Sequence, residues 1–261
     1  MRRASSILPP AGVTASSGAL LEVRGLSKAF GGLRAVDNLS FTVQEGEILG
    51  LLGPNGSGKT TVFNLIAGAL RPDGGQISLS GVPITGRPPS ARTTLGIART
   101  FQLVRSFPTL RVSENVLIAC LHGRDRSPDL DRAGLEAAKL LDLVDLAAKS
   151  GVLAGKLTLA ERKRLEIVRA LAARPRLLLL DEPMAGLNPE EIDAALRLFR
   201  QIRAGGVTVV IVEHNVGAVR ALCDRVVVLS SGKKIAEGPP KQALEHPEVI
   251  DVYLGRTPAQ H

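Results

Sequence analysis

The sequence predicts an α/β fold with a mainly parallel sheet. An apolar run at 48–52 leads into a glycine-rich loop and then into a second apolar segment, which is the order strand, loop, helix. Further apolar runs at 177–180, 207–212 and 226–229 are too short for helices and alternate with segments of helical character. Strands that alternate with helices form parallel sheets covered on both faces.

Composition and charge limit the possible classes. The chain has 261 residues, and its 44% hydrophobic and 22% charged content is that of a globular protein. No apolar stretch reaches the ~18 residues needed to span a bilayer. The net charge of +8 permits an anionic partner. However, acids are interspersed among the bases, as at 161–166, and there is no Trp, so we expect no nucleic-acid partner and a solvated surface that can face a membrane.

Both ends of the chain differ from its middle. Residues 1–19 are basic but are interrupted by Pro9 and Pro10, so we expect a disordered tail rather than a signal peptide. We place one domain at 20–255 and a second short tail at 256–261. The two cysteines, Cys120 and Cys223, are not spaced like metal ligands. We expect them to be free thiols without a special role in a cytosolic protein.

A small antiparallel β lobe is predicted before and after the glycine-rich loop. Residues 39–43 alternate between apolar and polar, and a Glu45-Gly46 turn follows, which predicts an antiparallel hairpin with one buried face. Residues 71–81 predict a turn and then a short strand.

A helical lobe is predicted at about 100–165, inserted in the domain, with a linker at 123–129. The segment is rich in Leu and Ala. Its apolar positions at helical spacing are Leu135, Ala138, Leu141 or Val144.

Two helices are marked by their ends. One is predicted from about Ala160 to Arg174, before Pro175. The other begins after Asn188, a capping residue that is followed by a proline and two acids, and it stops at Gly205.

Residues 53–61 read GPNGSGKTT and predict a phosphate-binding loop, or P-loop. The glycines let the backbone curl so that several N–H groups point at one anion, and the positive end of the next helix adds to this effect. Lys59 supplies a mobile charge for the β- and γ-phosphates, and Thr60 supplies a hydroxyl for Mg²⁺. A chance glycine-rich turn is disfavoured because every motif position is filled. The predicted binding residues are Gly53, Pro54, Asn55, Gly56, Ser57, Gly58, Lys59, Thr60 and Thr61.

Two carboxylates close the apolar run at 177–180. Asp181 can hold Mg²⁺ through its hydration shell, and Glu182 can polarise a water in line with the γ-phosphate. The alternative is a pair of solvated acids at the end of a strand. The P-loop earlier in the chain disfavours this alternative.

Two further polar residues complete the set. Gln102 lies between the β lobe and the helical lobe, where it could reach Mg²⁺ or the attacking water. His214 follows a buried strand and could bind the γ-phosphate. A lone histidine is more often structural, but its place after a buried strand downstream of Asp181 and Glu182 favours the functional role.

Over about residues 20–255, the chain resembles the ATP-binding-cassette ATPases. The resemblance rests on the order of its motifs, which is the P-loop, Gln102, a signature-like segment at 157–161, the carboxylate pair and His214. The resemblance implies ATP and Mg²⁺ as ligands. It also implies that Phe30 stacks on adenine, while a core phenylalanine remains the alternative.

Segments 29–41, 96–116, 181–191 and 245–255 resemble the ATP-binding subunits of branched-chain amino acid importers. The resemblance implies a peripheral protein at the cytoplasmic face of the inner membrane, docked under two transmembrane permease subunits. A second ATPase subunit and, indirectly, a periplasmic solute-binding protein complete the implied assembly. A groove near 101–107 is expected to receive a helix of a membrane subunit.

The signature departs from the family's usual LSGGQ, since residues 157–161 read LTLAE. Thr158 keeps a hydroxyl and Ala160 offers a backbone N–H to the partner's nucleotide, but both glycines are lost and Glu161 adds a negative charge. We therefore hypothesise that this chain's P-loop is competent when a partner's signature completes it. The site completed by its own signature is weaker, which favours a second, different ATPase chain.

Three alternatives remain open from the sequence. They are the ATPase of a lipid or lipopolysaccharide exporter, a soluble non-transport ATPase of the same family, and a nucleotide-binding regulator without turnover. Glu182 disfavours the last. The solute stays open among leucine-type amino acids, urea, amides and aromatic acids, because an ATPase subunit does not touch it.

Overall fold

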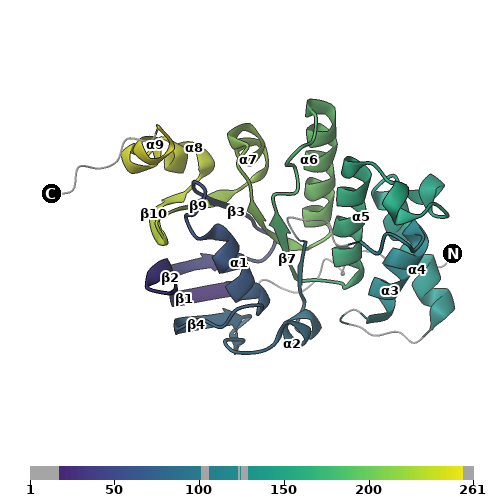
Figure 1. Ribbon diagram of the computed structural model, residues 1–261, viewed down its shortest axis with the longest axis horizontal. Helices are drawn as coiled ribbons and strands as arrows, with labels where there is room; N and C mark the ends of the chain where they lie inside the picture. Colours follow the sequence, from purple (N-terminus) through teal and green to yellow (C-terminus); the bar gives the residue numbers. More distant parts are fainter. Residues whose placement is uncertain (1–17, 101–105, 123, 125–128, 255–261) are drawn as a thin grey trace. The chain divides into compact units, whose positions relative to one another are not determined.

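The computed structural model describes residues 18–100, 106–122, 124 and 129–254, and these form two compact units. The middle unit holds the described residues of 93–207, and the terminal unit holds those of 18–92 and 208–254. The colour gradient of Figure 1 separates them, with teal and green in the middle unit and purple, blue, lime and yellow in the terminal unit.

The terminal unit contains an antiparallel sheet with the order β2-β1-β4-β5. Its strands are β1 (Leu21–Phe30), β2 (Leu33–Val43), β4 (Gly74–Leu79) and β5 (Val82–Pro83). The alternation at 39–43 buries Leu39, Phe41 and Val43, as predicted. The hairpin itself is not the one that the Glu45-Gly46 turn suggested. β2 pairs with the preceding β1 through Gly31-Gly32, whose positive φ values permit a tight turn, and the Glu45-Gly46 turn leads to a different sheet.

The same unit contains a sheet in which β3 lies parallel to both of its neighbours. The order is β10-β9-β3-β8, with β10 antiparallel to β9. Every residue of β3 and β8 is buried, which explains their continuous apolar sequences. The strands are β3 (Ile48–Leu52), β8 (Thr208–Val212), β9 (Arg225–Ser230) and β10 (Lys233–Gly238). The helices are α1 (Lys59–Ala67), α7 (Val216–Leu222), α8 (Pro240–Leu244) and α9 (Pro247–Leu254), and α2 (Pro89–Thr94) spans the sequence boundary of the units.

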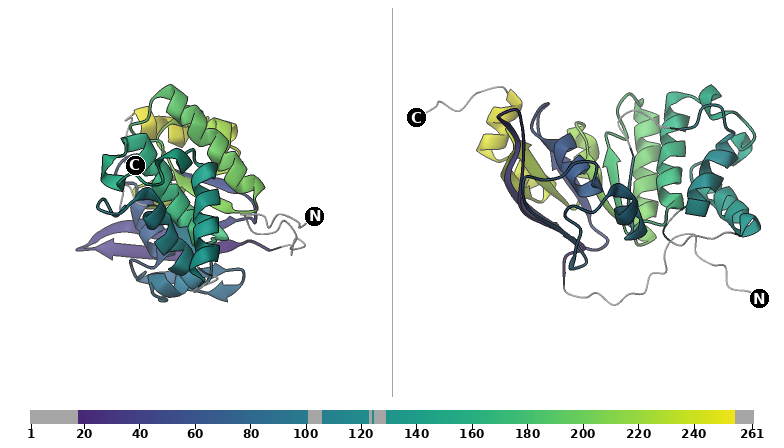
Figure 2. Two further views of the ribbon diagram at one scale, coloured as in Figure 1. Left: turned by 90° about the vertical axis from the view of Figure 1, so that its right-hand side faces the viewer. Right: turned by 60° about the horizontal axis from the view of Figure 1, so that its bottom comes forward.

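The middle unit pairs two parallel strands with a group of helices. β6 (Ile97–Arg99) lies parallel to the fully buried β7 (Leu177–Asp181). Helices α3, α4 and α5 pack against one another, as Figures 1 and 2 show. The helices are α3 (Val112–His122), α4 (Leu130–Leu143), α5 (Leu159–Ala172) and α6 (Pro189–Ala204), with short 3₁₀ turns at Ala147–Lys149 and Ala154–Lys156.

The buried face of α4 differs from the predicted one. Leu135 and Ala138 are exposed, whereas Leu141 and Val144 are buried as expected. The inward positions of the helix are Ala133, Ala137, Leu140 and Leu141. These positions recur at helical spacing and form one face, and Leu135 lies outside that face.

Helix ends follow the predicted chemistry with one shift. Asn188 caps α6 through a reciprocal capping box with Glu191, with proline in the first turn. Helix α5 ends at Ala172, two residues earlier than predicted, because Arg174 takes a left-handed φ of 52°.

The structure confirms the predicted α/β class. It contains parallel strands, a small antiparallel β lobe and a group of packed helices inserted in the sequence after that lobe. Among the described residues, no helix combines the length and the apolarity that crossing a bilayer requires.

Candidate functional site

The loop between β3 and α1 curls as the glycine pattern predicted. Gly53, Gly56 and Gly58 have φ values of 144°, 79° and 102°. A Cβ at Gly53 would lie 2.2 Å from the carbonyl oxygen of Leu229, and one at Gly58 would lie 2.2 Å from that of Ala35. Side chains are therefore excluded at both positions by close backbone contacts as well as by φ.

Lys59 opens α1 and turns its ammonium back into the loop. It is only 5% exposed, and its Nζ donates to the carbonyl oxygens of Gly53 at 2.8 Å and Pro54 at 2.9 Å. Thr60, the next residue, is exposed in the first turn. The ammonium of Lys59 therefore lies at the positive end of a helix, where an anion binds favourably. The oxygens of such an anion can replace the carbonyl oxygens as acceptors.

These residues fit a nucleoside phosphate and a hard divalent cation. The curled glycine backbone and Lys59 match phosphate oxygens, and the exposed Thr60 hydroxyl is an oxygen ligand of the kind that Mg²⁺ prefers.

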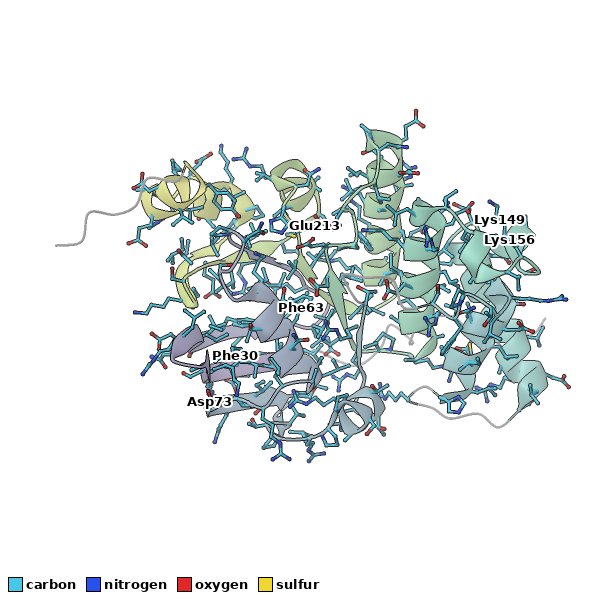
Figure 3. The ribbon with its side chains drawn as sticks, in the orientation of Figure 1. Phe30, Phe63, Asp73, Lys149, Lys156 and Glu213 are labelled. Atoms are coloured by element: carbon cyan, nitrogen blue, oxygen red, sulfur yellow. The ribbon has the colours of Figure 1, made fainter. Side chains whose placement is uncertain are left out.

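His214 follows β8 in the terminal unit and is exposed. Its backbone N–H donates to the carboxylate of buried Glu213 at 3.2 Å, and Glu213 is labelled in Figure 3. The next residue, Asn215, caps α7 by accepting from the N–H of Ala218 at 3.0 Å. The backbone that carries the imidazole is therefore held on both sides, while its ring stays accessible.

Phe30 ends β1 and is 47% exposed, so it is not a core phenylalanine. The ammonium of Lys28 lies 5.5 Å from the ring centroid and forms an ion pair with Asp73 at 2.6 Å. Asp73 also accepts from the N–H of Ala29 at 2.7 Å. The ring, labelled in Figure 3, is thus accessible and has a tethered cation beside it.

In the middle unit, Asp181 ends β7 and is buried. Its N–H donates to the hydroxyl of Thr100 at 3.2 Å, and the Arg99 guanidinium lies 3.6 Å from its carboxylate. These contacts come from β6 and the residue after it, so the parallel pairing of β6 with β7 sets the position of the carboxylate.

Glu182 has a φ of 48°, a left-handed conformation that is unfavourable for a residue with a Cβ. Lys163, from α5, donates from its Nζ to the backbone carbonyl of Glu182 at 2.9 Å. Sequence reasoning did not identify Lys163. No local pattern indicates that a lysine 19 residues earlier reaches this carbonyl.

The signature-like segment begins α5. Thr158 is its N-cap and forms a capping box with Glu161, and Ala160 lies in the first turn. The Glu161 carboxylate accepts from the N–H of Thr158 at 3.0 Å and pairs with Lys149, whose hydrogen bond lowers the pKa of Glu161. We expected a negative charge here, and the structure balances that charge with Lys149, which Figure 3 labels.

Gln102 lies outside the described residues, as does most of the expected groove at 101–107. Phe107 is described and exposed, with the Arg169 guanidinium 4.8 Å from its ring centroid. Buried Asn115 accepts from the N–H of Phe107 at 2.8 Å and donates to its carbonyl at 3.0 Å.

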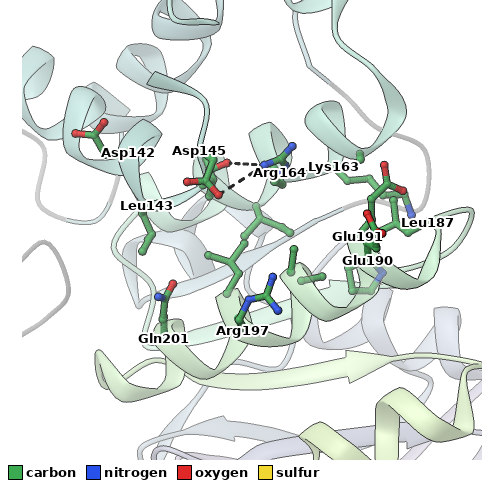
Figure 4. Close-up of a pocket in the computed structure, with 17 residues that line it drawn as sticks. Asp142, Leu143, Asp145, Lys163, Arg164, Leu187, Glu190, Glu191, Arg197 and Gln201 are labelled. Carbon is green, nitrogen blue, oxygen red and sulfur yellow. Dashed lines mark hydrogen bonds and ion pairs between the residues drawn. The ribbon is translucent and has the colours of Figure 1, made fainter. Parts of the chain in front are cut away.

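A cavity of about 460 Å³ lies within the middle unit, beside α5 and α6, as Figure 4 shows. Val144, Ile167 and Leu198 contribute apolar surface, and Asp145 and Arg164 approach to 3.9 Å at its edge. Of the predicted site residues, Ala160 alone lines it. No sequence motif pointed to this cavity.

The two cysteines have no place in this chemistry. Both are buried, and burial raises the pKa of Cys120 and of Cys223 to about 12, so the thiols stay protonated near neutral pH.

Comparison with known proteins places these features in a family. Residues 36–185 match the family model described as ABC transporter, and residues 233–259 match the model described as branched-chain amino acid ATP-binding cassette transporter.

Three relatives illustrate the similarity. The high-affinity branched-chain amino acid transport ATP-binding protein BraF of Pseudomonas aeruginosa is 41% identical over 249 residues, covering 90% of this chain and 98% of the relative. LivG of Escherichia coli K12, with the same description, is 38% identical with the same coverage. The lipopolysaccharide export system ATP-binding protein LptB of Escherichia coli K12 is 39% identical over 239 residues, covering 91% of this chain and 98% of LptB.

Solved structures agree with these relatives. The ADP conformation of MJ1267, an ATP-binding cassette of an ABC transporter, superposes with a TM-score of 0.84 at 31% identity, covering 91% of this chain and 99% of that one. CbiO1 from Clostridium perfringens, part of the cbiONQ transporter complex, has a TM-score of 0.79 at 26% identity and covers 91% and 96% of the two chains.

Proposed function

The chain belongs to the ABC transporter family and is an ATPase of that family, and from this premise we propose that it powers the uptake of branched-chain amino acids across a membrane. The observation that carries the choice of solute is the C-terminal match at 233–259 to the branched-chain amino acid transporter model. The relatives BraF and LivG, named for that transport, support the same choice.

We propose that the P-loop binds the phosphates of ATP. Lys59 exchanges the carbonyl oxygens of Gly53 and Pro54 for phosphate oxygens, and the accessible ring of Phe30 stacks on the adenine. Thr60, Asp181 and Gln102 hold Mg²⁺, which neutralises charge on the phosphates when bound.

Glu182 is the proposed general base. Its carboxylate polarises the water that attacks the γ-phosphorus, and its left-handed backbone, held by Lys163, fixes the direction from which the carboxylate acts. His214 donates a hydrogen bond to the γ-phosphate from an accessible position whose backbone is held by Glu213.

The proposed assembly contains two transmembrane permease subunits and a second ATPase subunit at the cytoplasmic face of the inner membrane. A periplasmic solute-binding protein delivers the amino acid. In this assembly, Thr158, Ala160 and Glu161 present the start of α5 to the nucleotide of the second ATPase subunit. Closure with ATP and opening after hydrolysis switch the permease.

Export of lipopolysaccharide is the second candidate, because LptB is as similar to this chain as LivG is. The two functions differ in the substrate that stimulates ATP hydrolysis by the intact membrane complex. Measuring hydrolysis with each substrate therefore distinguishes import from export.

The test uses the complex reconstituted in proteoliposomes with its binding protein and labelled leucine. We expect leucine to stimulate hydrolysis and to accumulate. The variant Glu182→Gln should bind ATP as the wild type does, hydrolyse it at least ~100-fold more slowly and show no uptake. Glu245→Gln, an exposed acid of the terminal unit, is the matched control and should behave as the wild type.

Near-normal turnover of Glu182→Gln would rule out its role as the base. Stimulation by lipopolysaccharide, with no response to leucine, isoleucine or valine, would replace import by export.

A further inference from the structure

Helix α9 reaches the P-loop through a polar contact. Tyr253, in the last turn of α9, accepts a hydrogen bond through its hydroxyl oxygen from the N–H of Gly53 at 3.1 Å, although 200 residues separate them in the chain. Helix α9 packs against β10 and α8, and its Val249 is buried, so the helix is anchored within its own unit.

Both polar backbone groups of Gly53 contact a side chain. Its N–H belongs to the peptide plane before the residue and donates to Tyr253, whereas its carbonyl belongs to the next plane and accepts from Lys59 at 2.8 Å. Peptide planes are rigid, so the φ and ψ of Gly53 are the only soft dihedrals between these two contacts. Glycine is the residue that changes such angles most easily.

Tyr253 suits a fixed contact of this kind. Partial burial raises the pKa of Tyr253 above its ordinary value of 10.0, so the hydroxyl is far from ionising near pH 7. Its ring has only two rotatable side-chain dihedrals, so little freedom is lost when it is held.

We propose that Tyr253 is a positioning residue for the P-loop. By holding the peptide before Gly53, it keeps the loop curled when Lys59 leaves the carbonyl oxygens of Gly53 and Pro54 for the phosphates of ATP. The C-terminal segment thereby tunes nucleotide affinity without touching the nucleotide. The proposal rests on the proposed ATPase function of the same loop.

The sequence supplies a direct probe of this contact. Tyr253 is the one tyrosine of the chain, which has no tryptophan, so the tyrosine emission of the wild-type protein reports on this phenol alone. When phosphates bind and Lys59 leaves the carbonyl oxygen of Gly53, the charge near the phenol changes while its hydrogen bond is kept, and its emission should change with it.

The experiment compares Tyr253→Phe with wild type as the full chain and in the membrane complex. The substitution keeps the ring and removes the acceptor. The KM for ATP should rise about fivefold, within the range for one lost hydrogen bond, with kcat within twofold of wild type. Ile250→Ala is the matched control, since Ile250 is 42% exposed and Tyr253 is 41% exposed on the same helix, and it should leave both constants unchanged.

The second readout is titration of wild-type tyrosine emission with the Mg²⁺ complex of a non-hydrolysable ATP analogue. Emission should change with a midpoint equal to the dissociation constant from calorimetry. An unchanged KM in Tyr253→Phe, an equal rise in Ile250→Ala, or constant emission at saturating nucleotide would each overturn the proposal. If wild type neither binds nor hydrolyses ATP, the proposed function fails instead, so the two failures are distinct.

Discussion

Lys163 donates a hydrogen bond from its ammonium to the backbone carbonyl of Glu182 at 2.9 Å. Glu182 has a φ of 48°, a conformation that costs about 1–3 kcal/mol for a residue with a side chain. The N–H of Ala185 donates to the same carbonyl at 3.2 Å. Two donors therefore stabilise the strained backbone from which the Glu182 side chain projects.

Replacing Lys163 by Met should slow hydrolysis without weakening ATP binding. The apolar stem stays, but one hydrogen bond to the strained carbonyl is lost, so kcat should fall about fivefold with KM within twofold. Steady-state phosphate release measures both constants, and Lys139→Met, an exposed lysine of α4, is the control. A raised KM with unchanged kcat would show that Lys163 acts on nucleotide binding instead.

Phe30 should matter to affinity through its ring. Base stacking on an aromatic is worth about 1–3 kcal/mol, so Phe30→Ala should raise the KM for ATP about tenfold and leave kcat near wild type. Leu33 is the control because it pairs with Phe30 across the β1–β2 hairpin and is 72% exposed. Leu33→Ala should change neither constant. Equal effects of the two substitutions would attribute the loss to the hairpin and not to the ring.

The parts of the molecule that sequence predicted are those set by local chemistry. The continuous apolar runs became β7, β8 and β9 because strands buried on both faces need no polar alternation. The cap at Asn188 became a capping box because its partner Glu191 lies three residues away. The curl of the P-loop followed from its glycines in the same way.

The parts that sequence missed depend on distant contacts or on packing. Leu135 is apolar, but it lies outside the face of α4 that is formed by Ala137, Leu140 and Leu141, so it is exposed and the smaller Ala137 is buried. The contacts of Lys163 with Glu182 and of Tyr253 with Gly53 join residues 19 and 200 positions apart, so no spacing rule applies to them. The charge of Glu161 was visible in the sequence, but its partner Lys149 was not.

The Lys149–Glu161 pair predicts a pH dependence of stability. The pKa of Glu161 is lowered in the folded state, first by the hydrogen bond from Lys149, so its contribution is complete above the unfolded value of 4.5 and is lost as pH falls below it. Half of the Lys149 side chain is exposed, which limits the expected effect to about 0.5 kcal/mol.

Urea unfolding of wild type and Glu161→Gln at several pH values tests this. Gln keeps the capping box and loses the charge, so the variant should be less stable at pH 7, and the difference should shrink as pH falls below the unfolded value of 4.5. Asn215→Ala is the control, because Asn215 caps α7 with a side chain that does not titrate, and loss of this cap should cost about 1 kcal/mol at every pH value. A difference that grows as pH falls would contradict the assigned direction.

The altered signature predicts that this chain is a weak partner for another chain's nucleotide. Glycine at position 160 would permit closer backbone approach, and Gln at 161 would remove the charge while keeping the capping box. We therefore expect the double substitution Ala160→Gly with Glu161→Gln to raise hydrolysis in the opposite site about threefold. Lys149 already balances the charge of Glu161, so the gain should come mainly from Ala160→Gly.

A mixed pair isolates that site. The Lys59→Ala chain has an inactive P-loop but an intact signature. In a dimer of this chain with wild type, ATP is hydrolysed only at the wild-type P-loop, and the signature of the Lys59→Ala chain completes that site. Single-turnover rates are then compared for Lys59→Ala chains with the native and with the doubly substituted signature. The substituted chain alone is the control and should be inactive. Equal rates in the two mixtures would show that the native signature does not limit turnover, and the preference for a second, different ATPase chain would lose its support.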